Sequence, residues 1–96
     1  MHPTKVDRAA LHALTDLPNV GPAVARDLVQ LGVTTPAQLA GKDPLALYQR
    51  LSALTGVRQD PCVLDTFIAV TRFMAGERPK AWWSYTAERK RRYPNL

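Results

Sequence analysis

Cysteine is almost absent from this 96-residue sequence, and long apolar runs are absent altogether. The single cysteine, Cys62, excludes an internal disulfide, and neither histidine lies near it in the sequence, so no zinc-ligand spacing is present. No apolar run approaches the roughly 18 residues of a membrane span, and we expect no membrane partner. The first residues lack the apolar core of a signal peptide, which makes the cytoplasm the expected compartment.

Residues typical of catalytic sites are also scarce. The only serines, Ser52 and Ser84, stand in no nucleophile-elbow pattern, and the two glutamates both lie in the basic end of the chain. The aspartates are dispersed, whereas a nuclease would need clustered carboxylates for two metal ions. A phosphate-binding P-loop is missing as well. We therefore expect a protein that is not an enzyme.

Apolar residues make up 46% of the sequence, which is enough for one globular domain with a modest core. The net charge of +5 is unevenly placed. Residues 1–76 carry seven lysines and arginines against six aspartates, whereas residues 77–96 carry six against two glutamates. A basic protein of this size is expected to have an anionic partner, nucleic acid first. Solubility explains a basic end equally well.

Proline and glycine mark the ends of successive predicted helices. The apolar spacing and these end signals predict helices over about residues 5–15, 23–31, 36–40, 44–55, 61–75 and 80–91. The fifth is apolar on most sides and should be central. No run alternates apolar and polar residues as a strand would. The expected fold class is all-α, a compact bundle of five to six short helices.

The basic end of the chain is also rich in aromatic residues. We expect residues 1–76 to form a helical domain, and residues 77–96 to form a C-terminal helix or tail packed on it or extending from it. The cations there are Arg78, Lys80, Arg89, Lys90, Arg91 and Arg92, interleaved with Trp82, Trp83, Tyr85 and Tyr93. Aromatic side chains beside cations can stack on unpaired bases. Tryptophans that cover the core explain the same pattern.

The stretch LPNVGPAVARDL, residues 17–28, predicts a tight turn between helices. Asn19 and Gly21 tolerate left-handed backbone angles and permit the reversal. The amides of Ala23 and Val24 would lie in the first helical turn, where they have no helical partner and the helix dipole favours negative charge. A helix start of this kind suits an anion such as phosphate, although the turn is equally sound as a purely structural one.

This stretch resembles the helix-hairpin-helix motif, whose hairpin reads roughly Leu-Pro-Gly-Val-Gly-Pro-x-x-Ala-x-x-Leu. The matching residues are Leu17, Pro18, Val20, Gly21, Pro22, Ala25 and Leu28, with Asn19 in place of the first glycine. The resemblance implies DNA binding without sequence preference, by hairpin amides on backbone phosphates. It also implies a monovalent cation held by hairpin carbonyls, and no other cofactor is expected. The expected nucleic-acid-binding residues are Asn19, Val20, Gly21, Ala23, Val24, Arg26, Arg58, Lys80, Arg89, Lys90, Arg91 and Arg92.

Over most of its length the sequence is similar to the small bacterial family of pathogenicity-locus proteins. The similarity lies in LPNVGPAVARDLVQLGVTTPAQLAGKDPLALYQRL and in DPCVLDTFIAV. The first half also resembles the C-terminal domain of bacterial competence regulators, which implies protein contacts for the hairpin instead. We therefore keep two hypotheses open, nucleic-acid backbone binding and a protein-interaction module in which the hairpin is structural.

Two further observations bear on these hypotheses. LTDLPNV at residues 14–20 lines up with LSALTGV at residues 51–57, which predicts a second hairpin and two pseudo-repeated units of the SAM-like type, although chance explains so short a match as well. Against DNA binding, Ala23 stands where many DNA-binding hairpins carry lysine. The charges of residues 15–32 sum to −1.

Overall fold

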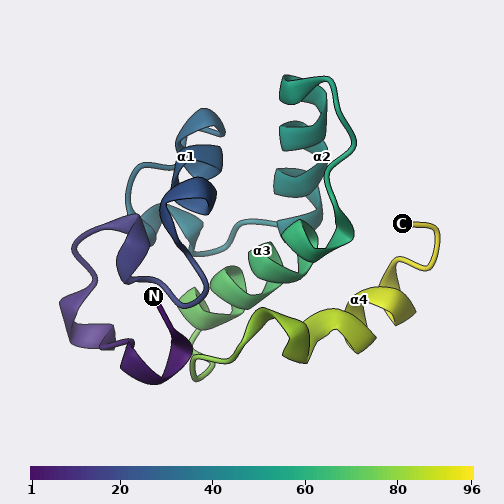
Figure 1. Ribbon diagram of the computed structural model, residues 1–96. Helices are drawn as coiled ribbons and strands as arrows, with labels where there is room; N and C mark the ends of the chain where they lie inside the picture. The colour runs from purple at the N-terminus through teal and green to yellow at the C-terminus, as the bar shows by residue number, and fades with distance from the viewer.

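The structure, a computed structural model, describes residues 1–96 and consists of helices without any strand (Figure 1). The α-helices are α1 Pro22–Gln30, α2 Pro44–Thr55, α3 Pro61–Met74 and α4 Thr86–Arg92. The 3-10 turns are η1 Pro3–Lys5, η2 Arg8–Ala10, η3 Leu14–Asp16, η4 Pro36–Leu39 and η5 Trp82–Tyr85. The chain is all-helical and compact as predicted, with four α-helices instead of five to six. None of these helices is long and apolar enough to cross a membrane.

The predicted ends of α2 and α3 are confirmed. An aspartate side chain caps the start of each of these helices. The Asp43 carboxylate accepts a hydrogen bond from the Leu45 amide at 3.0 Å, and the Asp60 carboxylate accepts one from the Cys62 amide at 2.9 Å. These bonds satisfy amides that have no helical partner. Gly56 ends α2 in the left-handed conformation, with φ of 70°.

The predicted helix over residues 5–15 is wrong, because the chain forms three separate 3-10 turns there. Asp16 accepts hydrogen bonds from the amides of His12 and Ala13, and Asp7 accepts one from Ala9. Such side-chain bonds compete with the helical pattern. Arg8 donates to the carbonyl oxygens of Phe73 and Glu77, so this segment is held against the end of α3.

The short helix expected over residues 36–40 is a 3-10 turn, η4. The side chain of Gln38 accepts hydrogen bonds from the amides of Thr34 at 2.6 Å and Thr35 at 3.3 Å. In return, the Gln38 amide donates to the Thr35 carbonyl oxygen at 3.2 Å. The expected helix over residues 80–91 is divided into η5 and α4.

The central place predicted for residues 61–75 is confirmed. Helix α3 runs through the middle of the molecule, with α2 and η4 packed on it from one side and η5 and α4 from the other (Figure 1). Phe67 and Phe73 of α3 are almost completely buried. Burial of such large apolar side chains is the main favourable contribution to folding. The N-terminal segment and the turn before α1 lie at the C-terminal end of α3 (Figure 1).

Candidate functional site

The turn before α1 has the tight geometry that the sequence predicts, but one residue produces it. Asn19 has a φ of 67°, and no other residue except glycine has a positive φ. Leu17 and Val20 on either side are completely buried and anchor the turn in the core. Gly21 differs from the expectation, because its φ of −97° and ψ of −172° are extended backbone that any residue can adopt. A β-carbon at Gly21 would meet no atom within 4 Å.

The start of α1 leaves backbone donors free. The N–H groups of Gly21, Ala23 and Val24 have no hydrogen-bond acceptor within the protein, and the first helical bond runs from the Ala25 amide to the Gly21 carbonyl oxygen at 3.0 Å. Among the three helices that begin with proline, α2 and α3 carry an aspartate cap, whereas Gly21 supplies none to α1. This helix start therefore has an unmet preference for negative charge.

The carbonyl groups of the same turn face a positive charge. The α-ammonium of Met1 donates to the carbonyl oxygens of Leu17 at 3.0 Å and Val20 at 2.8 Å. Burial lowers the pKa of this ammonium, and the nearby Asp16 carboxylate partly opposes that effect. The two carbonyls fit the monovalent cation implied by the resemblance, since they already converge on a positive group. A bound ion would compete with the Met1 ammonium. No cluster of three or more metal-ligating side chains is present elsewhere.

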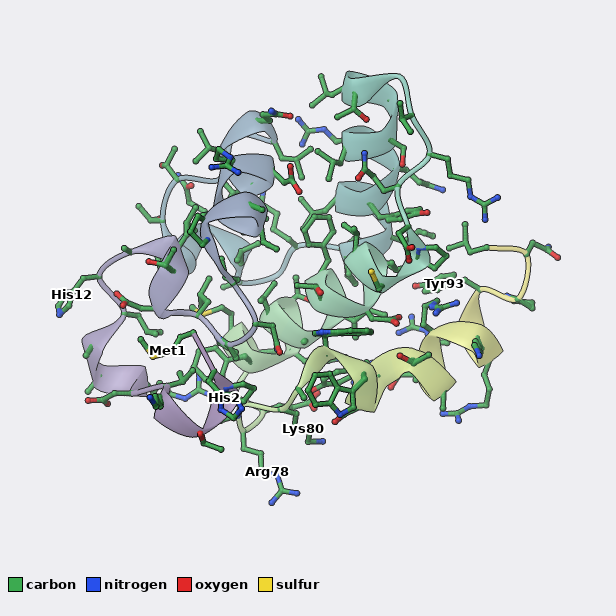
Figure 2. All side chains as sticks on the ribbon, viewed as in Figure 1. Met1, His2, His12, Arg78, Lys80 and Tyr93 are labelled. Atoms are coloured by element: carbon green, nitrogen blue, oxygen red, sulfur yellow. The ribbon has the colours of Figure 1, made fainter.

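The side chain of Asn19 connects the turn to the C-terminal part of the chain. Its Nδ2 donates to the Lys80 carbonyl oxygen at 2.8 Å, and its Oδ1 accepts from the Trp82 amide at 3.1 Å. Figure 2 shows Arg78 and Lys80 on the same side of the molecule as Met1. The Lys80 backbone therefore lies against the turn, while the Lys80 ammonium lies 3.9 Å from the Glu77 carboxylate. The sequence gives no signal for this contact, because the paired residues lie more than 60 positions apart.

A pocket of about 360 Å³ lies beside the turn, lined by Asn19, Trp82 and Trp83 together with the first three residues of the chain. The two indole rings meet edge to face, with centroids 5.6 Å apart. Trp82 is half-buried, but Trp83 is 63% exposed. The hypothesis that the tryptophans cover the core therefore does not describe Trp83. Tyr85 is the aromatic residue of this segment that enters the core.

Of the other predicted cations, only Arg26 lies within one helical turn of the start of α1. Arg26 is exposed on α1, and Arg58 is exposed in the loop between α2 and α3. Lys90, Arg91 and Arg92 are exposed on α4, which lies at the opposite end of the molecule from the turn (Figure 1). Two separate basic regions result, one beside the turn and one on α4.

Arg89 was expected to contact nucleic acid, and its position in the structure corrects that expectation. Its guanidinium Nε donates to Asp65 at 2.9 Å, and Asp65 is completely buried in α3. The Thr86 hydroxyl donates to the same carboxylate at 2.8 Å. The hydrogen bond to Asp65 raises the pKa of Arg89. A helix turns its side chains to every side, so one cation of a four-residue run faces inward and finds this acid.

The second turn repeats the backbone of the first without its packing. Gly56 has a φ of 70°, close to the 67° of Asn19. However, Leu54 and Val57 are 59% and 63% exposed, whereas Leu17 and Val20, at the corresponding positions of the first turn, are buried. The helix that follows is already capped by Asp60. The internal match therefore describes a shared turn shape and leaves two apolar side chains on the surface.

Comparison with known proteins covers most of the chain. The family model described as Pathogenicity locus (Cdd1) matches residues 7–91. The chain is 49% identical over 78 residues to a mitomycin resistance protein, McrB, from Streptomyces lavendulae. That alignment covers 81% of this chain and 74% of the relative. No solved structure matches the chain.

Proposed function

This chain belongs to the pathogenicity-locus family, and from that premise and the geometry of the turn we propose that it binds the sugar-phosphate backbone of nucleic acid without sequence preference. The turn and α1 would act as a helix-hairpin-helix element. The observation that carries the proposal is the uncapped start of α1, where the amides of Gly21, Ala23 and Val24 have no acceptor. A phosphate oxygen would take the position that an aspartate carboxylate takes at the starts of α2 and α3.

Gly21 supports this proposal because its backbone conformation does not require glycine. Its backbone angles suit any residue, and a β-carbon would point into open space. Glycine at such a position leaves room for another molecule to approach the backbone closely. Arg26, one turn further along α1 and exposed, supplies a cation to the same approach.

The number of cations near the turn implies weak binding. Each neutralised phosphate contributes about 0.9 to the salt slope on duplex DNA, and the two segments that meet at the turn carry three cations, Arg26, Arg78 and Lys80. Lys80 already lies 3.9 Å from the Glu77 carboxylate, which reduces its contribution. We therefore expect dissociation constants of about 10⁻⁴ to 10⁻⁶ M, the range of non-specific binding.

Fluorescence anisotropy of a labelled duplex and a labelled single strand, at about 50 and 200 mM salt, tests the proposal. Gly21→Glu should abolish binding to both, since its carboxylate would compete for the free amides while the open space around Gly21 lets the protein fold. Ala53→Glu adds the same charge at an exposed site on α2 and should reduce binding only slightly. Circular dichroism of both variants checks folding. The proposal would be overturned if the anisotropy titrations showed no binding at either salt concentration, or if the two variants lost equal affinity.

The alternative is a protein-interaction module, and the exposed side chains of Val29, Leu54 and Val57 favour it. Isolated apolar side chains on a surface are common, so only a contiguous patch would carry this function. The double variant Leu54→Ser, Val57→Ser should then weaken a protein complex and leave nucleic-acid binding unchanged. Gly21→Glu should have the opposite pattern.

We also propose mitomycin resistance for this chain, because the 49% identical relative is named for it. Growth of a deletion strain under mitomycin, complemented with the wild-type chain, would measure this role. If resistance depends on the turn, Gly21→Glu should fail to complement and Ala53→Glu should succeed. Equal complementation by both would separate resistance from the turn.

A further inference from the structure

We infer that the pocket beside the turn is a subsite for one unpaired nucleobase, with Trp83 as its stacking surface. This inference rests on the proposed backbone binding and specifies the form of nucleic acid that suits the site. Its starting point is Trp83, which is 63% exposed although it is among the largest apolar side chains in the chain. Packing in the core does not explain a tryptophan at residue 83, because Tyr85 is the residue of turn η5 that is buried in the core.

The pocket is continuous with the phosphate-binding turn. Asn19 produces the turn and also lines the pocket, together with Trp82 and Trp83. Its carboxamide holds the Trp82 amide, and the Trp82 ring contacts the edge of Trp83 at a centroid distance of 5.6 Å and an interplanar angle of 82°. The exposed indole is therefore fixed relative to the free amides of α1. One nucleotide chain could place a phosphate at the amides and a base on the indole.

Charge near the pocket favours an anionic occupant over an uncharged one. Arg78 is exposed, makes no ion pair or hydrogen bond through its side chain, and extends from the body beside Lys80 (Figure 2). Glu77, next to Arg78 in the chain, is paired with Arg72 and Lys80 and accepts a hydrogen bond from the Tyr85 hydroxyl. Asp16 lies near Met1, and its carboxylate accepts hydrogen bonds from the amides of His12 and Ala13. Aromatic rings in a segment that also carries an unpaired cation match the pattern of single-stranded nucleic-acid sites.

The base must be unpaired because a base inside a duplex already stacks on both faces. A single strand or a frayed end offers a free face, and every base has one, so the subsite would not require a particular sequence. Removal of one base–aromatic stack weakens binding by roughly five-fold to a hundred-fold.

The experiment compares three labelled probes with equal numbers of phosphates: an oligothymidine single strand, an abasic strand of the same length, and a blunt duplex. We expect the oligothymidine to bind more tightly than the abasic strand. Trp83→Ala should remove that preference, and Trp83→Phe should retain part of it, because phenylalanine still stacks. Val57→Ala changes an equally exposed apolar residue away from the pocket and should change nothing. Quenching of tryptophan fluorescence by oligothymidine should fall in Trp83→Phe.

The outcomes separate this inference from the proposed function. Equal binding of the oligothymidine and abasic strands, unaffected by Trp83→Ala, would overturn the base subsite and leave backbone binding intact. Absence of binding to all three probes would overturn both. Unchanged nucleic-acid binding in Trp83→Ala, combined with loss of a defined protein complex, would assign the pocket to a protein partner instead.

Discussion

Asp65 is the only acidic residue that is completely buried, and it determines how the basic run of α4 is divided. Its two carboxylate oxygens accept hydrogen bonds from Arg89 and Thr86, so the charge is paired and hydrogen-bonded inside the protein. A buried charge is tolerated under these conditions and is costly when its partner is removed. Arg89 is therefore a structural residue, and the run offers three cations to a ligand instead of four.

Asp65→Asn should lower the free energy of unfolding by about 3–5 kcal/mol, because it leaves the Arg89 guanidinium buried without a counter-charge. Urea denaturation monitored by circular dichroism measures the change. Glu88→Gln is the comparison: it removes a carboxylate that pairs with Arg72 and, at 3.4 Å, with Arg92, but all three side chains are partly exposed and stay hydrated when the pairs are lost. That change should cost about 1–2 kcal/mol, since each partly exposed pair contributes at most about 1 kcal/mol.

A double variant completes this test. Asp65→Leu with Arg89→Met removes both charges together and should recover much of the loss, because well-packed apolar residues often replace a buried pair without penalty. Equal losses for Asp65→Asn and Glu88→Gln would contradict the structural role that we assign to the pair.

At the scale of elements, Asn19 connects the turn before α1 to the segment before η5, and the candidate site depends on this connection. It forms the turn before α1 and, through its side chain, holds the segment that leads into η5. Two roles in one residue explain why asparagine stands where the helix-hairpin-helix motif has glycine. Asparagine adopts left-handed backbone angles more readily than other residues that have a side chain. Unlike glycine, it also has a side chain that can hydrogen-bond to another segment.

Two substitutions separate these roles. Asn19→Gly keeps the turn and loses both side-chain hydrogen bonds, whereas Asn19→Ala loses the bonds and places a β-carbon at a left-handed φ, which costs about 1–2 kcal/mol more. We expect both variants to free the segment around Trp82, seen as a red shift of tryptophan fluorescence. Asn19→Ala alone should show the additional loss of stability. Equal unfolding free energies would contradict the turn role.

The sequence predicted α2 and α3 well, since their aspartate caps, prolines and end glycines are local signals. The first predicted helix failed because Asp7 and Asp16 bond to nearby amides, an outcome that apolar spacing does not reveal. The shape of the turn was also predictable, except that Asn19 alone carries the left-handed angle. The contact from Asn19 to Lys80 and Trp82 could not be predicted from the sequence, because it depends on how α3 directs the chain back to the turn.

At the scale of the whole molecule, the positive charge forms two regions at opposite ends. One region comprises Arg26 of α1 with Arg78 and Lys80 of the segment that Asn19 holds, and the other is the exposed part of α4. The molecule is 36 Å along its longest axis. Successive phosphates of one DNA strand are about 3.4 Å apart along the helix, so roughly ten base pairs span that length. A ligand therefore reaches both regions only if it is long enough.

This arrangement predicts that the contribution of α4 depends on the length of the ligand. The triple variant Lys90→Gln, Arg91→Gln, Arg92→Gln should weaken binding to a duplex of about 20 base pairs and reduce its salt slope by up to about 2.7, since each lost phosphate contact removes about 0.9. The same variant should bind a tetranucleotide as the wild-type chain does, because so short a strand covers only the turn and the pocket. Anisotropy titrations over a salt series measure both. Arg89 is left unchanged in this variant, so its buried ion pair with Asp65 is kept, and circular dichroism checks that loss of the exposed Arg92–Glu88 pair leaves the protein folded. Equal losses on the short and long ligands would mean that α4 acts through the general charge of the protein, and an unchanged slope on the duplex would restrict the binding surface to the turn.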